Sequence, residues 1–465
     1  MTDQAFSTLP LGQPWLDNLA QLEYRHMTPI QALALPLMLA GHDVLGQAGT
    51  GTGKTAAFGL ALLARIKPGG DRPGALVLCP TRELAAQIAD EIRRLARPLA
   101  HTKVLTLCGG TSISRDRVSL GHGVDVVVGT PGRVLDHLTR GRLELDAVAT
   151  LVLDEADRML EMGFIDAVTT IARATPASRQ TLLFSATFPD SVRALSDSFQ
   201  RDAHQIAVAA DDGTAAVVQR IYDLGPLERP AALARILGHH CPDSAVIFCN
   251  QRETCEVVAA SLTAAGHPAV ALHGGMAQHD RDTVLLLLRN GTLRLLVATD
   301  VAARGLDIDD LAAVINYELP RDAAGYVHRI GRTARAGRSG LAITLSGPGD
   351  RRAIDQLRRG PLAGVASSPV PPLGAARGRT RPPTMVTIAI QGGRRDKLRP
   401  GDIVGALTTA VGIAAADIGQ IQVLDRISFV ALAAAAAPRA LAGLGRGHIK
   451  KRRFRSYLVS IPTSP

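Results

Sequence analysis

Two carboxylates have the types and the position that phosphoryl transfer requires. Asp154 and Glu155 directly follow the apolar run Leu151–Leu153, which predicts that they lie at the C-terminal end of a buried strand, where open α/β sheets bind ligands. One carboxylate can hold Mg²⁺ while the other orients or deprotonates the attacking water. Asp154 suits the first role and Glu155 the second. A solvated charge cluster is the alternative for these residues taken alone.

A glycine-rich loop earlier in the chain can hold the phosphates. It follows a short apolar run at 43–45 and precedes a helical stretch, which is the context of a phosphate-binding loop. Its glycines let backbone N–H groups converge on phosphate oxygens at a helix N-terminus. Lys54 would reach the β and γ phosphates and Thr55 would bind Mg²⁺, although a plain glycine-rich turn is the alternative. The loop comprises Ala48, Gly49, Thr50, Gly51, Thr52, Gly53, Lys54 and Thr55.

A third segment concentrates arginines. Arg329, Arg332 and Arg335 occur within residues 328–335. Arginines supplied across a domain cleft stabilise the charge that builds on a transferring γ-phosphoryl group. A basic surface helix is the alternative for this segment alone.

The elements that must position these residues form two series. Short apolar runs separated by helix-like stretches predict strands buried on both faces of a parallel sheet. The runs are 75–79, 125–128, 151–153 and 182–184, and then 245–249, 269–272, 293–298 and 313–315. We expect two α/β domains, at residues 1–208 and 216–346, joined by a less regular segment.

The chain after residue 346 differs from the two α/β series in composition and in its pattern of apolar residues. Residues 347–384 are rich in Pro, Gly, Ala and Arg, which predicts a helical start at 350–359 and then a flexible linker. Strand-like runs at 385–390, 418–424 and 427–432 and a helical stretch at 400–411 predict a small α+β domain at 385–461. The expected fold class is therefore α/β, two tandem parallel-sheet domains followed by a small α+β domain.

Composition favours folded cytosolic domains. Hydrophobic residues make up 46% of the chain and charged residues 20%, which is typical of globular cores. No run approaches the roughly 18 apolar residues of a membrane span, and the N-terminus lacks a signal core. The five cysteines are odd in number and form no CxxC pair, which predicts buried free thiols.

Basic charge is concentrated near the C-terminus. The net charge is +10, but residues 1–346 hold 33 Lys and Arg against 36 Asp and Glu. The remaining residues hold 19 against 6, a net charge of +13. This local basic field favours an anionic partner such as nucleic acid.

Residues 6–346 resemble the DEAD-box RNA helicases, because nearly every motif of that family occurs in order. The resemblance implies two RecA-like domains, with ATP between them and single-stranded RNA crossing both. Phe6, Thr28 and Gln31 match the adenine-reading motif, in which the glutamine binds the base and the aromatic ring stacks on it. At Glu23 the family usually has glycine, which puts the local turn in question.

Further matches imply residues that hold RNA phosphates without reading bases. They are Pro80, Thr81, Arg82, Gly109, Gly110, Thr130, Pro131, Gly132 and Arg133 in the first domain and Thr299 in the second.

Other matches imply residues that complete the ATP site or couple it to RNA. Asp157 would bond to Ser185 and Thr187, in the motif that couples hydrolysis to strand separation. In the second domain, Gly305 and Asp307 would face the nucleotide, Arg332 and Arg335 would be the arginine fingers, and His328 and Arg329 would link the two sites.

Residues 385–461 resemble the RNA-binding domain of bacterial DbpA helicases, which has an RRM-like fold and tethers those enzymes to large-subunit ribosomal RNA. The strand at 425–432 lacks the paired aromatic residues with which an RRM stacks on bases, so we expect RNA contact elsewhere on the domain. The candidates lie in the basic run 446–455 and include Lys450, Lys451, Arg452 and Arg453. A solvated, nonspecific tail is the alternative.

We therefore expect an RNA-dependent ATPase and ATP-dependent RNA helicase that uses ATP and Mg²⁺. It would be a cytoplasmic monomer without membrane association, tethered to large-subunit ribosomal RNA and pre-ribosomal particles during ribosome assembly. An ATP-gated RNA clamp or assembly scaffold without productive unwinding is the competing hypothesis. Intact Glu155, Arg332 and Arg335 argue against an inactive enzyme. A DNA helicase is a weaker third hypothesis.

Overall fold

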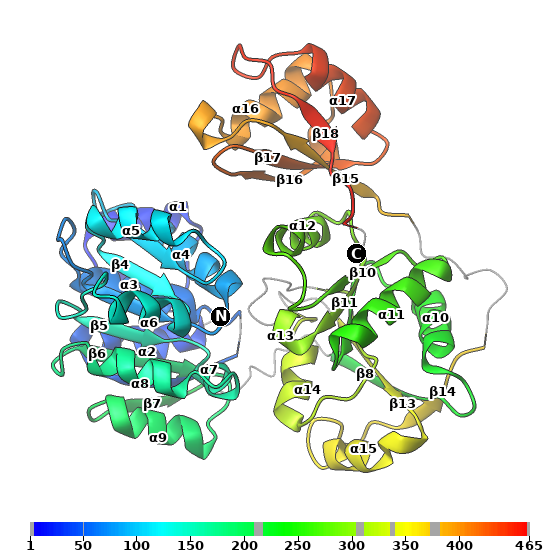
Figure 1. Cartoon of the computed structure of the whole chain (residues 1–465), viewed down its shortest axis with the longest axis horizontal. Helices are drawn as coiled ribbons and strands as arrows, with labels where there is room; N and C mark the ends of the chain where they lie inside the picture. Colours follow the sequence, from blue (N-terminus) through cyan, green and yellow to red (C-terminus); the bar gives the residue numbers. More distant parts are fainter. Residues whose placement is uncertain are drawn as a thin grey trace. The chain divides into compact units, whose positions relative to one another are not determined.

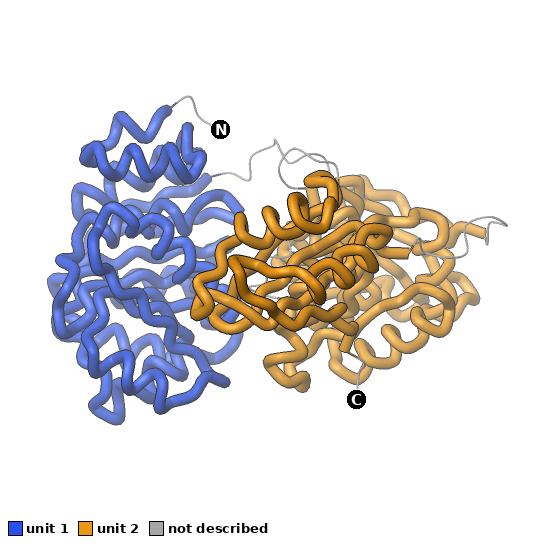
Figure 2. Tube along the Cα trace, turned by 90° about the horizontal axis from the view of Figure 1, so that it is seen from above, with its two compact units in different colours: residues 1–213, 305–307 blue, residues 214–304, 308–465 orange. Residues whose placement is uncertain are grey.

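The computed structural model of the chain describes residues 4–49, 51–208, 217–303, 311–334, 340–372 and 382–462. The chain forms two compact units, residues 1–213 with 305–307 and residues 214–304 with 308–465 (Figure 2). The second unit holds a large and a small domain.

The first unit is built on a seven-stranded parallel sheet with the order β3-β4-β2-β5-β6-β1-β7 (Figure 1). Its central strands are buried along their whole length, because helices cover both faces of the sheet. This burial explains why they appear in the sequence as continuous apolar runs. The strands are β1 (Val44–Gln47), β2 (Ala75–Leu78), β3 (Val104–Leu107), β4 (Val126–Gly129), β5 (Thr150–Leu153), β6 (Gln180–Ser185) and β7 (His204–Ala207).

Two hydrophobic cores lie between this sheet and its helices. Val77 and Phe184 belong to one core, whereas their neighbours Leu76 and Leu183 belong to the other, because successive side chains of a strand point to opposite faces. The first core is covered by α1 (Gln13–Gln21), α2 (Pro29–Ala40), α3 (Lys54–Arg65) and α4 (Arg82–Leu95). The second is covered by α6 (Pro131–Thr139), α7 (Ala156–Glu161), α8 (Ile165–Arg173) and α9 (Asp190–Phe199), and α5 (Ile113–Gly121) follows β3.

The large domain of the second unit repeats this plan with the strand order β10-β11-β9-β12-β13-β8-β14, again all parallel. Its strands are β8 (Val217–Asp223), β9 (Ala245–Cys249), β10 (Ala269–Leu272), β11 (Leu295–Thr299), β12 (Ala313–Asn316), β13 (Gly340–Ser346) and β14 (Ser367–Pro369). Its helices are α10 (Arg229–His240), α11 (Arg252–Ala264), α12 (Gln278–Arg289), α13 (Asp300–Ala303), α14 (Ala323–Ile330) and α15 (Arg351–Arg358). The predicted tandem of two parallel α/β domains is confirmed.

The predicted helical start at 350–359 is present as α15, and the segment after it, which was expected to be a flexible linker, is partly folded. α15 buries Ile354 and Leu357 against Tyr326 of α14, because apolar residues three apart lie on one face of a helix. β14 then adds an edge strand to the sheet by pairing with β8. The flexible linker was therefore predicted to begin too early. Its predicted residues 373–381 lie outside the described part of the chain.

The small domain has an antiparallel sheet with the order β16-β17-β15-β18, and two helices cover one of its faces. On the other face, Thr387 is fully buried. Its Oγ1 accepts a hydrogen bond from Asn290 Nδ2 (3.0 Å) and lies 2.8 Å from Thr292 Oγ1, both in the turn after α12. The elements are β15 (Met385–Ile390), α16 (Pro400–Gly405), β16 (Ile418–Val423), β17 (Ser428–Ala433), α17 (Ala437–Arg446) and β18 (Ser456–Leu458). This confirms the small α+β domain.

The five cysteines are free thiols, and Cys79, Cys108, Cys249 and Cys255 are buried as predicted, whereas Cys241 is partly exposed. Burial raises the pKa of the Cys108 thiol to about 11. Within the described ranges, the chain contains no helix with the length and apolar character of a membrane span.

Candidate functional site

Most of the predicted residues of the first unit lie at or just after the carboxyl ends of its strands. In a parallel sheet these ends lie at one edge, which is where α/β sheets bind ligands. β1, β5 and β6 are close together in the strand order and lead into the glycine-rich loop, Asp154 and Ser185. β2, β4 and β3 form the other end of the order and lead into residues 80–82, 130–133 and 109–110. The strand order thus divides the predicted residues into a phosphate group and an RNA group.

Lys54 is the first residue of α3. Its buried ammonium group has an ion-pair contact but no hydrogen bond among the described residues. The residue is 5% exposed, and Nζ lies 3.6 Å from Asp154 Oδ1. Among the described residues, Nζ has no hydrogen-bond partner. Burying a charge without hydrogen bonds costs free energy, so this position favours an anionic ligand that can bond to Nζ.

The loop before Lys54 has the backbone of a phosphate cradle. Gly51 and Gly53 have φ of +79° and +90°, a region that glycine adopts without strain. The loop is fixed at its start, where the Ala48 amide donates to the Ser185 carbonyl at 3.1 Å. Thr52 Oγ1 donates to the Gly49 carbonyl at 2.9 Å. Thr55 lies in the first turn of α3, and Thr50 is outside the described residues.

Asp154 and Glu155 are both buried at the end of β5. Asp154 Oδ1 accepts a hydrogen bond from the Glu155 amide at 3.0 Å. Glu155 has φ +52° and is the cap residue before α7. A left-handed backbone costs a non-glycine residue on the order of 1 kcal/mol, and such strain concentrates at functional sites.

Asp157 is bonded to the segment after β6, as its expected coupling role requires. Its Oδ2 accepts hydrogen bonds from the Thr187 amide (3.1 Å) and the Thr187 hydroxyl (2.9 Å). Ser185 Oγ donates to the Thr187 carbonyl at 2.7 Å and accepts from the Asp157 amide at 3.4 Å. The segments after β5 and β6 are therefore joined by three of these hydrogen bonds, and the fourth holds the end of β6 itself.

Gln31 is tied to the glycine-rich loop. Its Oε1 accepts from the Thr28 amide (2.9 Å) and its Nε2 donates to the Gly53 carbonyl (3.1 Å). Phe6 is only 3% exposed and packs edge-on against Tyr24. Stacking of Phe6 on an adenine therefore stays a prediction, and it requires the ring to become accessible.

The departure from the family pattern at Glu23 leaves a left-handed turn in place. Glu23 has φ +64°, the region that glycine adopts without strain. The backbone of this turn thus has a conformation that glycine would favour, although the side chain differs.

On the RNA side of the edge, Arg82 lies against the glycine pair that follows β3. A Cβ on Gly110 would overlap with Arg82 Nη1, and one on Gly109 would lie 3.2 Å from Nη2. Gly110 also has φ +80°. Thr81 caps α4, because its Oγ1 accepts from the Leu84 amide at 3.3 Å. The structure therefore brings two of the predicted RNA-contacting segments together.

The third predicted segment, 130–133, begins α6. Thr130 is its cap residue, and a Cβ on Gly132 would meet open space. Arg133 is directed to protein groups, since Nη1 donates to Asp116 (3.1 Å) and Nη2 donates to the Thr111 carbonyl (3.0 Å). Asp116 was not predicted from the sequence, because an acidic residue in a helix with polar neighbours gives no signal of burial.

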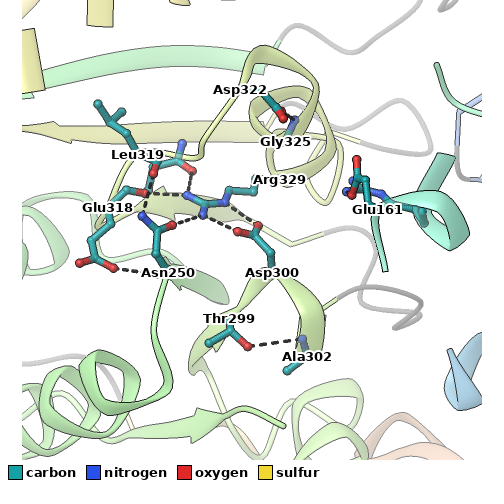
Figure 3. Close-up of polar contacts among 12 residues, drawn as sticks. Glu161, Asn250, Thr299, Asp300, Ala302, Glu318, Leu319, Asp322, Gly325 and Arg329 are labelled. Carbon is teal, nitrogen blue, oxygen red and sulfur yellow. Dashed lines mark hydrogen bonds and ion pairs between the residues drawn. The ribbon is translucent and has the colours of Figure 1, made fainter. Parts of the chain in front are cut away.

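In the second unit, Arg329 is the centre of an interior polar network (Figure 3). It is 1% exposed and donates to both oxygens of Asp300, at 2.7 and 2.6 Å. It also donates to Asn250 Oδ1 (2.9 Å), Asn316 Oδ1 (3.2 Å) and the Glu318 carbonyl (2.6 Å). Arg329 thus connects the carboxyl ends of β9, β11 and β12.

The other predicted residues of the second unit's large domain that the structure describes lie at the end of β11 and on or just after α14. Thr299 ends β11, where its Oγ1 accepts from the Ala302 amide at 3.4 Å (Figure 3). His328 precedes Arg329 on α14, and Arg332 follows the helix, where its carbonyl accepts from the Leu311 amide at 3.2 Å. Gly305, Asp307 and Arg335 lie outside the described residues.

Two of the four predicted cations of the small domain form ion pairs with acidic residues of the same domain. Lys450 Nζ lies 3.2 Å from Asp402 Oδ2, and Arg452 Nη1 lies 3.1 Å from Asp396 Oδ1. Lys451 and Arg453 are exposed and form no ion pair within the described part of the chain. These two cations are therefore the more accessible members of the predicted set.

Comparison with known proteins explains this arrangement. Residues 28–195 match the DEAD/DEAH box helicase family, 228–337 the helicase conserved C-terminal domain and 387–457 the DbpA RNA binding domain. The chain is 48% identical over 462 residues to the ATP-dependent RNA helicase DbpA of Escherichia coli strain K12, which covers 98% of this chain and 99% of that protein. The chain belongs to the DbpA group of DEAD-box RNA helicases.

Other relatives share the helicase core of this DbpA-group protein. The ATP-dependent RNA helicase CshA of Listeria monocytogenes is 44% identical over 344 residues, 74% of this chain and 66% of that protein. Saccharomyces cerevisiae Dbp5 bound to RNA and ADP BeF3 matches with a TM-score of 0.71 and 30% identity, over 79% of this chain and 96% of that one. The DbpA-group helicase is thus an ATP-dependent enzyme with an added RNA-binding domain.

Proposed function

We propose that this helicase hydrolyses ATP when RNA is bound and thereby separates short duplexes in large-subunit ribosomal RNA during ribosome assembly. The observation that carries the proposal is the buried Lys54–Asp154 pair at a glycine-rich loop, in a chain that ends in an RNA-binding domain. A role on pre-ribosomal particles would place the protein in the cytoplasm, and a single copy suffices for it.

The described residues fit ATP with Mg²⁺. Lys54 has a buried ammonium group that forms no hydrogen bond within the described part of the chain, and it would bind the phosphates. Asp154 and Thr55 would hold the metal ion, which is a role that carboxylate and hydroxyl oxygens serve well. Bound Mg-ATP would supply the phosphoryl group that is transferred to water. Glu155 would accept the proton of that water, and Arg332 of the second unit would stabilise the developing charge.

RNA would be held by the segments that follow β2, β3 and β4. Their backbone amides and hydroxyls suit phosphates, which makes binding tolerant of sequence. Dbp5 binds RNA and a nucleotide analogue together on a related core, which supports the proposal that this core binds both.

The tether to ribosomal RNA would use the helices and loops of the small domain. Around Thr387, the face of its sheet that an RRM uses for stacking is instead bonded to Asn290 and Thr292. Lys451 and Arg453 are exposed and uncompensated among the described residues, so they would contact phosphates. Lys450 and Arg452 would contribute less, because Asp402 and Asp396 already pair with them.

A Glu155→Gln variant tests the hydrolytic step. The amide keeps the size of the side chain but cannot take a proton, so RNA-stimulated ATPase activity should fall by about 100-fold or more, while binding of ATP and RNA persists. Glu144→Gln is the control, because Glu144 pairs with Arg72 on the exposed surface. An ATPase rate of Glu155→Gln equal to that of the wild type would refute the role of Glu155.

A double variant, Lys451→Ser with Arg453→Ser, tests the tether in the full chain. Preference for ribosomal RNA fragments over unrelated RNA in ATPase stimulation should decrease, while stimulation by saturating unrelated RNA is retained. Arg351→Ser with Arg352→Ser removes the same charge from exposed positions of α15 and should leave the preference intact. If both double variants behave alike, the assignment of the tether to these cations is wrong.

The clamp hypothesis makes a different prediction for strand displacement. A short duplex placed beside a ribosomal RNA hairpin should be separated in an ATP-dependent manner by a helicase. ATP hydrolysis without displacement would support an RNA clamp instead.

A further inference from the structure

The buried carboxylate of Asp116 belongs to no segment to which RNA contact has been assigned so far. It lies in the first turn of α5 and is 3% exposed. Burying a carboxylate is unfavourable unless it is paired and hydrogen-bonded. The identity of its partners therefore indicates why the carboxylate is there.

Three groups converge on one oxygen of this carboxylate. Arg133 Nη1 lies 3.1 Å from Asp116 Oδ2, His137 Nε2 lies 3.3 Å from it, and Thr111 Oγ1 lies 3.5 Å from it. His137 is fully buried on α6, and among the described residues its Nδ1 has no partner. Among the described residues, Asp116 therefore supplies the one polar contact of this imidazole, and it is the counter-charge of Arg133.

The same partners fix the two segments proposed to hold RNA. Thr111 directly follows Gly110 in the turn after β3, and its Oγ1 donates to the Cys108 carbonyl at 2.8 Å. Arg133 lies in the first turn of α6 and also donates to the Thr111 carbonyl at 3.0 Å. Asp116 thus joins the start of α6 to the turn after β3, and its own side chain and that of Arg133 are 5% and 10% exposed.

We propose that Asp116 is a positioning residue for RNA binding, which fixes the Gly109–Gly110 turn and the 130–133 segment in one arrangement without touching RNA itself. The proposal rests on the proposed role of these segments as phosphate contacts. Holding them in advance reduces the ordering that RNA binding must impose. Without Asp116, the Arg133 guanidinium would lose its counter-charge and the two segments would be free to separate.

The sign of the change in RNA affinity distinguishes a positioning role of Asp116 from a direct effect of its charge. Asp116→Asn removes a negative charge near the proposed RNA path, which by Coulomb attraction alone would strengthen binding of an anion. If Asp116 positions the two segments, the same substitution should instead weaken RNA binding. We expect the concentration of poly(U) RNA that gives half-maximal ATPase activity to rise by about tenfold, which corresponds to about 1.4 kcal/mol. The rate at saturating RNA and the KM for ATP should change less than twofold.

Asp136→Asn is the matched control in the full-length protein. Asp136 lies on α6 and pairs with Arg140 at the surface, so the substitution makes the same change in charge without disturbing the buried contacts. It should leave the half-maximal RNA concentration unchanged or slightly lower. Asp116→Glu keeps the charge and should recover part of the lost affinity.

Three outcomes decide the matter. A lower urea midpoint for Asp116→Asn with an unchanged half-maximal RNA concentration would mean a purely structural role and would overturn the proposal. If Arg82→Ala and Gly110→Ala also leave RNA binding unchanged, the proposed RNA contacts themselves are wrong. If those two variants weaken binding and Asp116→Asn does not, only the positioning role fails.

Arg133→Lys provides the test if Asp116→Asn does not fold. Lysine can still contact a phosphate as a point charge, but it cannot hold Asp116 and the Thr111 carbonyl together as the planar guanidinium does. The positioning role predicts a similar loss of RNA affinity for this variant. Binding equal to that of the wild type would overturn it.

Discussion

Arg329 and Asp300 form a two-point ion pair inside the second unit, with Nε to Oδ1 at 2.7 Å and Nη2 to Oδ2 at 2.6 Å. The Arg329 guanidinium also lies over the Phe248 ring, 5.0 Å from its centroid. Two-point pairing of this kind is specific to arginine. Because the pair joins the end of β11 to α14, it fixes the segment that carries His328 and Arg332.

We predict that Arg329→Ala lowers the free energy of unfolding of the second unit by about 3 kcal/mol, because it leaves Asp300 without its counter-charge. Hydrogen exchange of β9 and β11 in increasing urea would measure this loss locally. Arg358→Ala is the control, since its pair with Asp355 is exposed and should contribute less than about 0.5 kcal/mol. Equal effects of the two substitutions would contradict the interior role of Arg329.

The hydroxyl of Thr187 offers a way to separate hydrolysis from unwinding. Thr187→Val removes the bond to Asp157 Oδ2 but keeps the amide bond to the same oxygen. ATPase activity should stay within about threefold of the wild type, whereas duplexes separated per ATP should fall by about tenfold, the size expected for one lost hydrogen bond to a charged group. Thr170→Val on the exposed face of α8 is the control. Parallel losses of both activities would show that Thr187 serves hydrolysis itself.

Gly110 is predicted to tolerate no side chain. In Gly110→Ala the new Cβ would overlap with Arg82 and would sit on a backbone with φ +80°, so both the backbone and Arg82 must move. Stability should decrease by about 1 to 2 kcal/mol, and the half-maximal RNA concentration should rise several-fold. Gly121→Ala at the end of α5, where a Cβ meets open space, should preserve both. The measurements are urea unfolding and RNA titration of ATPase activity.

Strands were predicted well where local sequence determines them. The strand at 245–249 was placed without error, because a fully buried parallel strand is a continuous apolar run bounded by polar residues. Lys54 and Asp154 were assigned from their loops, and the structure places them 3.6 Å apart. The strand, Lys54 and Asp154 were each predicted from sequence features that lie within a few residues of the position concerned.

The missed features depend on contacts between distant residues. The burial of Asp116 arises from α6, and the order at 367–369 arises from pairing of β14 with β8. The glycines at 443 and 445 weaken the helical signal of α17 in the sequence. Gly443 is needed there, since a Cβ would overlap with Val411. The secondary-structure propensity of a short segment carries no information about its contacts with distant residues.

The second unit should lose stability in mild acid because of His240. Burial lowers the pKa of this histidine from its ordinary 6.5 to about 4, with further lowering by the positive charges of His239 and Arg220. In the unfolded chain the residue takes up a proton below pH 6.5, whereas in the folded protein it stays neutral until about pH 4. Its contribution to stability is therefore fully present above pH 6.5 and is lost as the pH falls from there to about 4.

His240→Gln should reduce this pH dependence, because glutamine does not titrate while its amide can still bond to the Tyr222 hydroxyl, which lies 2.8 Å from His240 Nε2. The measurement is the urea midpoint for hydrogen exchange in α10 and β8 at pH 7, 6 and 5. The difference between pH 7 and pH 5 should be smaller in the variant than in the wild type. His279→Gln, at an exposed position of α12, should retain the wild-type difference. An unchanged pH dependence in His240→Gln would assign the acid sensitivity to other groups.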